Sequence, residues 1–248
     1  MTSDPRSDEL AANLATVRDR ISVACRRVGR PPAELIVVTK FFGPDDVRRL
    51  ARLGVTDVGE NRDQEAAAKH SACSDLPLTW HFIGQLQSNK AKSVVRYADL
   101  VHTVDRPSIV RALDKAAFGQ DKRQDVLLQV NLDPQPREQR GGAAPSEVPD
   151  LLARIVATDG LRLRGVMGVA PLGGDAAAAF TQLRETSMRV CDLVPDAAVI
   201  SAGMSADLEV AVAHGATHLR IGTAVMGSRP DVRYRPTKGG KFNEGDAQ

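Results

Sequence analysis

The feature that most constrains the fold is a regular alternation of short strand-like runs with helical patterns, from residue 34 to residue 222. Strands are predicted over residues 34–40, 56–60, 78–84, 100–105, 125–132, 161–169, 198–203 and 218–222. Helices are predicted between them over residues 44–53, 62–72, 88–97, 107–118, 147–158, 175–194 and 205–213. Eight strands, with a helix after each of the first seven, predict a parallel α/β sheet. At 248 residues, the closed arrangement is a single (β/α)8 TIM-type barrel. The alternative is an open doubly wound sheet, whose usual glycine-rich turn after the first strand is missing here.

An extra helix is predicted before the first strand. Apolar residues recur at spacings of three and four from Leu10 to Val28, which gives one apolar face. Ser7 is the predicted N-cap, and Gly29 is expected to end the helix. This helix is expected to cover an end or a side of the barrel. We expect residues 8–235 to form one domain and residues 1–7 and 236–248 to be disordered tails.

Composition excludes several classes of function. Charged residues make up 26% of the chain and the net charge is only +2, which gives no reason to expect a nucleic-acid or membrane partner. No apolar run approaches the ~20 residues of a membrane helix, and residues 1–8 do not resemble a signal peptide. The three cysteines are far apart, as expected for reduced thiols in a cytoplasmic protein. The histidines lack metal-ligand spacing, so no metal site is expected. No exposed apolar stripe demands a partner, so we expect a monomer.

Lys40 ends the apolar first strand and is the first candidate for chemistry. Burial at a strand end disfavours the charged ammonium, so a neutral, nucleophilic amine becomes accessible. Such a lysine can form a Schiff base with a carbonyl compound. The alternative is that its side chain simply extends from the strand end into water.

The other predicted strand ends supply polar and small residues at the face where barrel enzymes have their active sites. These are Asn61, His81, Met167, Ser201, Gly203, Met204, Ser205, Arg220, Gly222 and Thr223. Glycines and hydroxyls after strands seven and eight are typical of a phosphate site in such barrels. The alternative is that these glycines only allow tight turns.

A lysine beside a phosphate site has two candidate ligands. One is a sugar phosphate, which would make the protein a class I aldolase; the other is pyridoxal 5′-phosphate (PLP). Arg220 favours PLP if it points inward at the pyridine nitrogen, because an arginine cannot accept a proton and the ring would stay unprotonated. In the alternative, Arg220 forms a salt bridge on the barrel exterior.

The motifs in chain order resemble one protein family. They are Val38-Thr-Lys40, Gly59-Glu-Asn61, Trp80-His-Phe-Ile-Gly84 with Gln87-Ser-Asn-Lys90, Thr103-Val-Asp-Arg106, Leu163-Arg-Gly-Val-Met167, Ser201-Ala-Gly-Met-Ser-Ala-Asp207 and Arg220-Ile-Gly-Thr-Ala224. This series resembles the pyridoxal phosphate homeostasis protein family from about residue 34 to 229.

The resemblance implies a barrel like the N-terminal domain of alanine racemase, with PLP held by Lys40. It implies phosphate contacts at Ser201, Gly203, Met204, Gly222 and Thr223, with Arg220 near the pyridine nitrogen and Asn61 and His81 near the cofactor. Members of the family are regarded as carriers of PLP or regulators of vitamin B6 and amino-acid pools, without robust turnover. Phe41-Phe42 and the loop 133–146 depart from common members of the family.

The resemblance leaves a carrier and an enzyme to be distinguished. Racemases of the similar fold use a lysine and a tyrosine as two bases. Here Tyr97 falls in a predicted helix and Tyr234 in the terminal segment, so neither lies at a strand end. We therefore expect a PLP-binding protein that can pass PLP to PLP-dependent apo-enzymes. The alternatives are a weak amino-acid racemase and a class I aldolase. Loop 133–146 is interpreted equally well as a mobile lid or a tolerated insertion.

Overall fold

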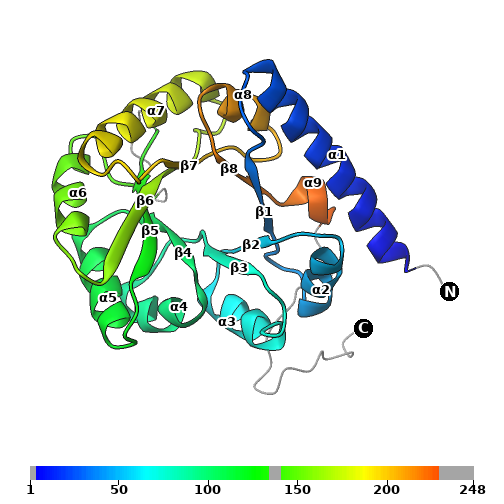
Figure 1. Cartoon of the computed structure of the whole chain (residues 1–248), viewed down its shortest axis with the longest axis horizontal. Helices are drawn as coiled ribbons and strands as arrows, with labels where there is room; N and C mark the ends of the chain where they lie inside the picture. Colours follow the sequence, from blue (N-terminus) through cyan, green and yellow to red (C-terminus); the bar gives the residue numbers. More distant parts are fainter. Residues whose placement is uncertain (1–3, 134–140, 229–248) are drawn as a thin grey trace.

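The fold is a closed barrel of eight parallel strands surrounded by helices, as the alternation predicts (Figure 1). This computed structural model describes residues 4–133 and 141–228. The strands run in chain order around the barrel as β1 (Glu34–Val38), β2 (Asp57–Glu60), β3 (Thr79–Phe82), β4 (Leu100–Val104), β5 (Gln124–Val130), β6 (Leu161–Gly168), β7 (Val199–Ser201) and β8 (His218–Ile221). β1 pairs with β8, with Ile36 opposite Arg220, and this pairing closes the barrel.

The helices that follow the strands confirm the predicted alternation. They are α2 (Pro44–Arg52), α3 (Asp63–Ala72), α4 (Ala91–Tyr97), α5 (Pro107–Phe118), α6 (Val148–Val156), α7 (Ala176–Leu193), α8 (Leu208–Ala213) and α9 (Thr223–Met226). The predicted helix 88–97 begins with a separate 3-10 turn, η1 (Ser88–Lys90). The short α9 was not predicted and follows β8 directly.

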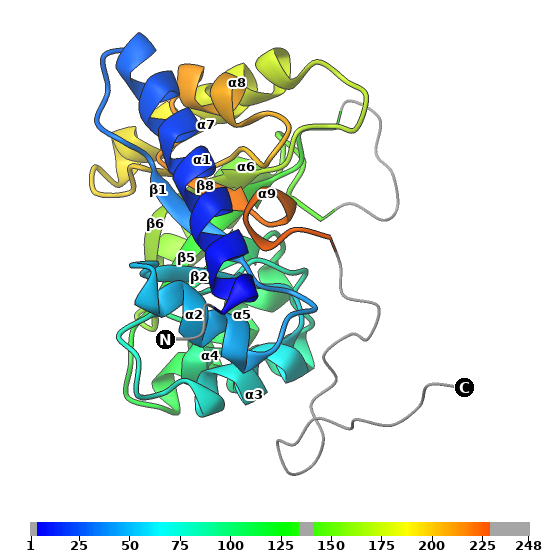
Figure 2. The same ribbon diagram turned by 90° about the vertical axis from the view of Figure 1, so that its right-hand side faces the viewer.

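The extra N-terminal helix is α1 (Pro5–Arg27), and it lies on the side of the barrel (Figure 2). It packs against α2, α8 and α9. Ser7 is not its N-cap. The cap is Asp4, whose carboxylate accepts a hydrogen bond from the Arg6 N–H, and Pro5 occupies the first helical position. The prediction that residues 1–7 are disordered is therefore wrong for residues 4–7.

Most of the apolar core lies between the strands and the surrounding helices, as expected of a barrel. A second, small cluster is formed by Leu100, Leu127 and Met167. The buried residues also include several polar side chains that are fully or almost fully enclosed, namely Thr39, Glu60, Lys69, His81, His102, Ser201 and Arg220. Buried polar groups need partners, and these groups are what the site is built from.

None of the helices in residues 4–133 and 141–228 combines the length and hydropathy that a membrane span requires. The predicted loop 133–146 lies partly outside the described residues, which omit 134–140. Its last part pairs with the end of β5, because the Asn131 N–H donates to the Ala143 carbonyl at 2.9 Å. The predicted tail 236–248 lies outside the described residues.

Candidate functional site

Lys40 lies in a tight turn just after β1. The Phe42 N–H donates to the Thr39 carbonyl at 3.1 Å and closes this turn. Phe41 has φ of 74°, a left-handed conformation that non-glycine residues seldom adopt. The Lys40 side chain is only partly buried, and its Nζ lies 5.9 Å from the centroid of the Phe41 ring. The turn therefore presents the amine beyond the strand end.

The end of β2 brings Asn61 beside this turn. A glycine at position 84 is required here, because a Cβ on Gly84 would lie 1.9 Å from the Asn61 carbonyl oxygen. The Gly84 carbonyl is itself held by the Thr103 hydroxyl at 2.7 Å. This close approach of the two strand ends explains the glycine in the Trp80–Gly84 motif and fixes the backbone of Asn61.

Arg220 points into the barrel from β8, and the alternative exterior position is excluded. The residue is 5% exposed, and its guanidinium donates to Ser201 Oγ at 2.6 Å and to the Gly168 carbonyl at 2.9 Å. Burial lowers the pKa of Arg220 to about 10, which still leaves the side chain charged near neutral pH. Among the described residues, no carboxylate lies within ion-pair distance of this cation.

A chain of hydrogen bonds runs from Arg220 through the interior of the barrel. Ser201 Oγ lies 3.0 Å from His102 Nδ1, and His102 Nε2 lies 2.9 Å from His81 Nδ1. His81 Nε2 in turn lies 2.8 Å from a carboxylate oxygen of Asp57. Burial, and then the nearby His81, hold the pKa of His102 well below its ordinary value. His102 is therefore neutral, and the chain joins Arg220 to Asp57.

Two short loops after β7 and β8 form the other side of the site. Gly203 has φ of 91°, and a Cβ there would meet Ala211 at 2.6 Å, so this position requires glycine. The Met204 N–H donates to an Asp207 oxygen at 2.6 Å, which holds the loop after β7 closed. Ser205 Oγ accepts from the Ala224 N–H at 3.4 Å and thereby joins this loop to α9.

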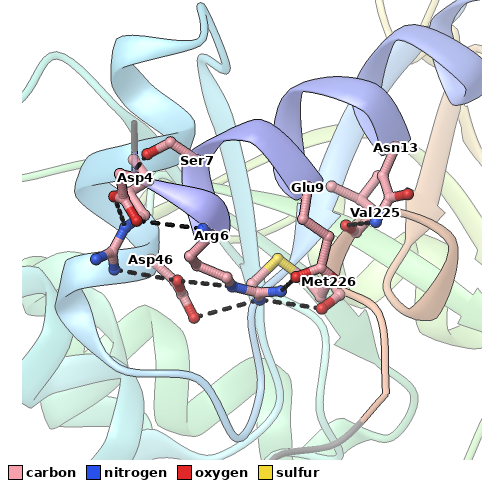
Figure 3. Close-up of polar contacts among 9 residues, drawn as sticks. Asp4, Arg6, Ser7, Glu9, Asn13, Asp46, Val225 and Met226 are labelled. Carbon is pink, nitrogen blue, oxygen red and sulfur yellow. Dashed lines mark hydrogen bonds and ion pairs between the residues drawn. The ribbon is translucent and has the colours of Figure 1, made fainter. Parts of the chain in front are cut away.

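The N-terminal helix anchors α9 from outside (Figure 3). Arg6 donates to the Met226 carbonyl at 3.0 Å, and Asn13 donates to the Val225 carbonyl at 3.0 Å. Arg6 also pairs with Asp46 of α2 at 3.2 Å. The last carbonyls of α9, which have no partner within so short a helix, are thus satisfied by α1. The first and last βα units of the barrel are joined beside the site.

These elements enclose a cavity of about 360 Å³ at the carboxyl ends of the strands. It is lined by Val38, Lys40, Phe41, Phe42, Asn61, Ile83, Met167, Val169, Met204, Ser205, Ala206, Arg220, Gly222, Thr223 and Gly227. Lys40 offers an amine, Arg220 a buried guanidinium, and the loops after β7 and β8 offer hydroxyls and glycines. Such a set can bind an anionic aromatic molecule and react with a carbonyl group. The described residues contain no group of three or more side chains able to hold a metal ion.

Comparison with known proteins identifies the family. The profile described as the alanine racemase N-terminal domain matches residues 12–230. The pyridoxal phosphate homeostasis protein of Mycobacterium bovis is 40% identical over an alignment of 245 residues, gaps included; the match covers 90% of this chain and 94% of that protein. The chain belongs to the pyridoxal phosphate homeostasis protein family.

Solved structures agree with this assignment. The structure of PipY from Synechococcus elongatus, with PLP bound, is 35% identical, with a TM-score of 0.77, and the match covers 88% of this chain and all (100%) of that one. Alanine racemase from Corynebacterium glutamicum has a TM-score of 0.68 at 14% identity; the match covers 90% of this chain and 61% of that enzyme, and it shows the shared fold only.

Most residues singled out from the sequence of this family member lie together in the cavity wall. They are Lys40, Asn61, Met167, Met204, Ser205, Arg220, Gly222 and Thr223. His81, Ser201 and Gly203 do not line the cavity. His81 and Ser201 lie in the hydrogen-bonded chain behind Arg220, and Gly203 supports the loop by accepting from the Arg220 N–H at 3.0 Å. Alternation shows that a strand residue points inward, but not how deep it lies.

Three buried residues of the site were not predicted. His102 lies within the apolar run of β4, while Glu60 and Lys69 look like ordinary charged residues of a strand end and a helix. Lys69 is completely buried, yet it sits among alanines and polar residues in a helix without a marked apolar face. Its only signal in the sequence was its spacing of nine residues from Glu60, which by itself has no specificity.

Proposed function

We propose that this chain binds PLP through a Schiff base on Lys40 and acts in vitamin B6 and amino-acid homeostasis without robust turnover of its own. The observation that carries the proposal is the presence of the Lys40 amine and the buried Arg220 guanidinium in one cavity at the carboxyl ends of the strands. The PLP-bound structure of PipY, a relative at 35% identity, supports the choice of cofactor.

The residues of the cavity fit three parts of this cofactor, namely its aldehyde, its ring nitrogen and its phosphate. PLP supplies an aldehyde for a lysine amine and an electron-withdrawing ring. Lys40 would hold the aldehyde carbon, and Arg220 would face the ring nitrogen with a charge that no carboxylate of the described residues neutralises within ion-pair distance. Ser205, Gly222 and Thr223 would hold the phosphate, since hydroxyls and glycine backbone suit an anion.

Two features favour a carrier over a racemase. Arg220 has a pKa of about 10 and stays protonated, so it can donate a hydrogen bond to the ring nitrogen but cannot accept one from it. The ring nitrogen therefore stays unprotonated, and the ring is a weaker electron sink. Tyr97 is buried in α4 and does not line the cavity, so this tyrosine is not available as a second base. Met204 is 38% exposed and Thr223 is exposed, so both rim residues face solvent, where an acceptor protein could approach.

The setting of this function is part of the proposal. We infer that the protein acts in the cytoplasm, because Cys25, Cys73 and Cys191 are free thiols, as a reducing compartment favours. PLP-dependent apo-enzymes are the proposed acceptors of PLP. We further propose that the chain works as a monomer.

The test is covalent capture of PLP by the purified protein. An imine absorbance band that disappears on borohydride treatment, with the pyridoxyl group recovered on the Lys40 peptide, is the expected result. Lys40→Ala should lose the adduct but unfold at the same temperature as the wild-type protein, because Lys40 lies in a turn outside β1. Lys115→Ala, at an exposed position of α5, is the matched control.

The same preparation separates the alternatives. If the PLP-loaded protein racemises added L-alanine at an enzymatic rate, the protein is a racemase and the proposal of a carrier is wrong. A protein that takes up no PLP would contradict the proposal and favour a sugar-phosphate ligand. A pyridoxyl adduct on another lysine would contradict the assignment of the Schiff base to Lys40.

A further inference from the structure

The turn that carries Lys40 is held in a conformation its own residues disfavour. Its second residue is Lys40 and its third is Phe41, whose φ of 74° is the value that a type II turn assigns to glycine. A phenylalanine there is strained by its Cβ. Such a conformation persists only where surrounding groups enforce it, and in this protein the strained residue adjoins the proposed covalent site.

One buried ion pair, between Lys69 and Glu60, contacts the first residue of this turn on the side away from the cavity. Lys69 Nζ donates to the Thr39 carbonyl at 2.8 Å, the same oxygen that accepts from the Phe42 N–H. The Lys69 ammonium also pairs with Glu60 Oε1 at 2.6 Å, and the Thr39 hydroxyl donates to that carboxylate oxygen at 2.5 Å. The side chains of Lys69 and Glu60 are 0% and 1% exposed. Three elements, β1, β2 and α3, therefore meet at the first residue of the turn.

A contribution to the stability of the fold does not by itself explain why this ion pair is buried. Two charges removed from water lose their hydration, and neutral side chains of similar volume often serve as well. Burial, opposed by Lys69, raises the pKa of Glu60, and its second oxygen, Oε2, has no hydrogen-bond partner in the described part of the chain. What the pair does contribute is a fixed geometry on both sides of the cavity, because Thr39 precedes Lys40 and Glu60 precedes Asn61.

We propose that Lys69 and Glu60 are positioning residues that hold the strained turn at Phe41 and so aim the Lys40 amine into the cavity for covalent capture of PLP. This inference rests on the proposed function of Lys40. Neither residue touches the cavity; both act through the Thr39 carbonyl and hydroxyl.

A double-mutant cycle tests the coupling between clamp and strain. The clamp, which is the Lys69–Glu60 pair, is removed by Lys69→Met with Glu60→Gln, which leaves no buried charge unpaired. The strain is removed by Phe41→Gly, because glycine adopts positive φ freely. The rate of imine formation with added PLP is followed by absorbance. Removing the clamp should slow it about tenfold to about 100-fold with Phe41 present, since a small misplacement of a reacting group costs this much. In the Phe41→Gly background, the same change should have little effect.

A second readout needs no PLP. Hydrogen exchange of the Phe42 amide, which donates to Thr39, should accelerate when the clamp is removed with Phe41 present and hardly change in the Phe41→Gly background. Equal effects in both backgrounds, or no effect with Phe41 present, would show that the pair only supports the fold and would overturn the inference. If wild-type protein captures no PLP at Lys40, the proposed function fails while amide exchange still decides on the clamp. Lys69→Gln, which lets Glu60 take up a proton, replaces the double variant if that variant does not fold.

Discussion

Arg220 is the residue that links the barrel interior to the cavity. It donates to Ser201 and to the Gly168 carbonyl, and it lines the cavity. Because no carboxylate of the described residues pairs with it, its charge is directed toward whatever fills the cavity. An arginine in this position keeps a facing pyridine nitrogen unprotonated, whereas a carboxylate would raise the pKa of that nitrogen.

Arg220→Glu is therefore expected to change the pH dependence of the absorbance of PLP-loaded protein. A spectral titration from about pH 5 to about pH 9 would show a ring-nitrogen transition shifted upward relative to Arg220→Gln, which removes the cation without adding a carboxylate. Both variants lose the bonds to Ser201 and Gly168, so the comparison isolates charge from packing. Identical titrations of the two variants would contradict the placement of Arg220 at the ring nitrogen.

At the level of single residues, the sequence predicts which strand ends face the cavity. Lys40, Asn61 and Arg220 follow from strand boundaries and from alternation. The positive φ of Phe41 does not, because local rules assign such a conformation to glycine, and here tertiary contacts with Lys69 enforce it. Contacts between β2 and α3, such as that of Glu60 with Lys69, depend on packing geometry that no single sequence displays.

Among the elements, α1 and α9 form the least expected pair. α9 has four residues and begins at Thr223, directly after Gly222, and both of these residues line the cavity. So short a helix has little stability of its own. Its carbonyls are held by Arg6 and Asn13 of α1, so the N-terminal helix supports the loop proposed to hold phosphate.

Asn13→Ala should lower the free energy of unfolding by about 1 kcal/mol, the usual net value of one hydrogen bond. It should also weaken the affinity for PLP, because α9 loses one of the two side-chain hydrogen bonds that Arg6 and Asn13 donate to its carbonyls. Thr16→Ala is the matched control, since its hydroxyl bonds only to the Ala12 carbonyl of the same exposed helix face. Urea denaturation and PLP titration measure both effects. Equal affinities for PLP in the two variants would rule out support of the loop by α1.

The order of elements was predictable, while their ends were less so. Eight strands and their helices follow from periodicity, because each must bury one face. The apolar stripe that begins at Leu10 predicts a start of α1 near Ser7, but periodicity marks a buried face and not a helix end. Pro5, which is favoured at a first helical position, was the available signal for a cap at Asp4. α9 is too short for any periodicity to reveal.

For the whole molecule, the barrel interior contains a polar chain that spans from Asp57 to Arg220. Burial, and then the nearby His81, lower the pKa of His218 to about 4, and the pKa of His102 lies well below its ordinary value. Unfolded, each histidine would titrate near 6.5. Between these values the unfolded chain binds protons that the folded chain does not, so stability falls as pH falls below about 6.5 and is fully present above it.

Glu60 opposes this trend. Its pKa is raised by burial, so stability from this group falls as pH rises from its ordinary value of 4.5 to its higher pKa in the folded chain, above which the carboxylate is charged. A measured slope is therefore the difference of two contributions. Comparing the wild-type protein with a variant that lacks one histidine isolates the contribution of that histidine to the slope, because Glu60 is present in both proteins.

His102→Gln should flatten the dependence of unfolding free energy on pH between about pH 7 and about pH 5. A fully buried histidine contributes at most ~1.4 kcal/mol per pH unit in this window, and glutamine cannot titrate. Urea denaturation at several pH values measures the slope. Ser201→Ala is the control, because it breaks the same chain beside His102 but removes no titrating group. If both variants flatten the slope equally, the pH dependence arises from loss of the hydrogen-bonded chain and not from protonation of His102.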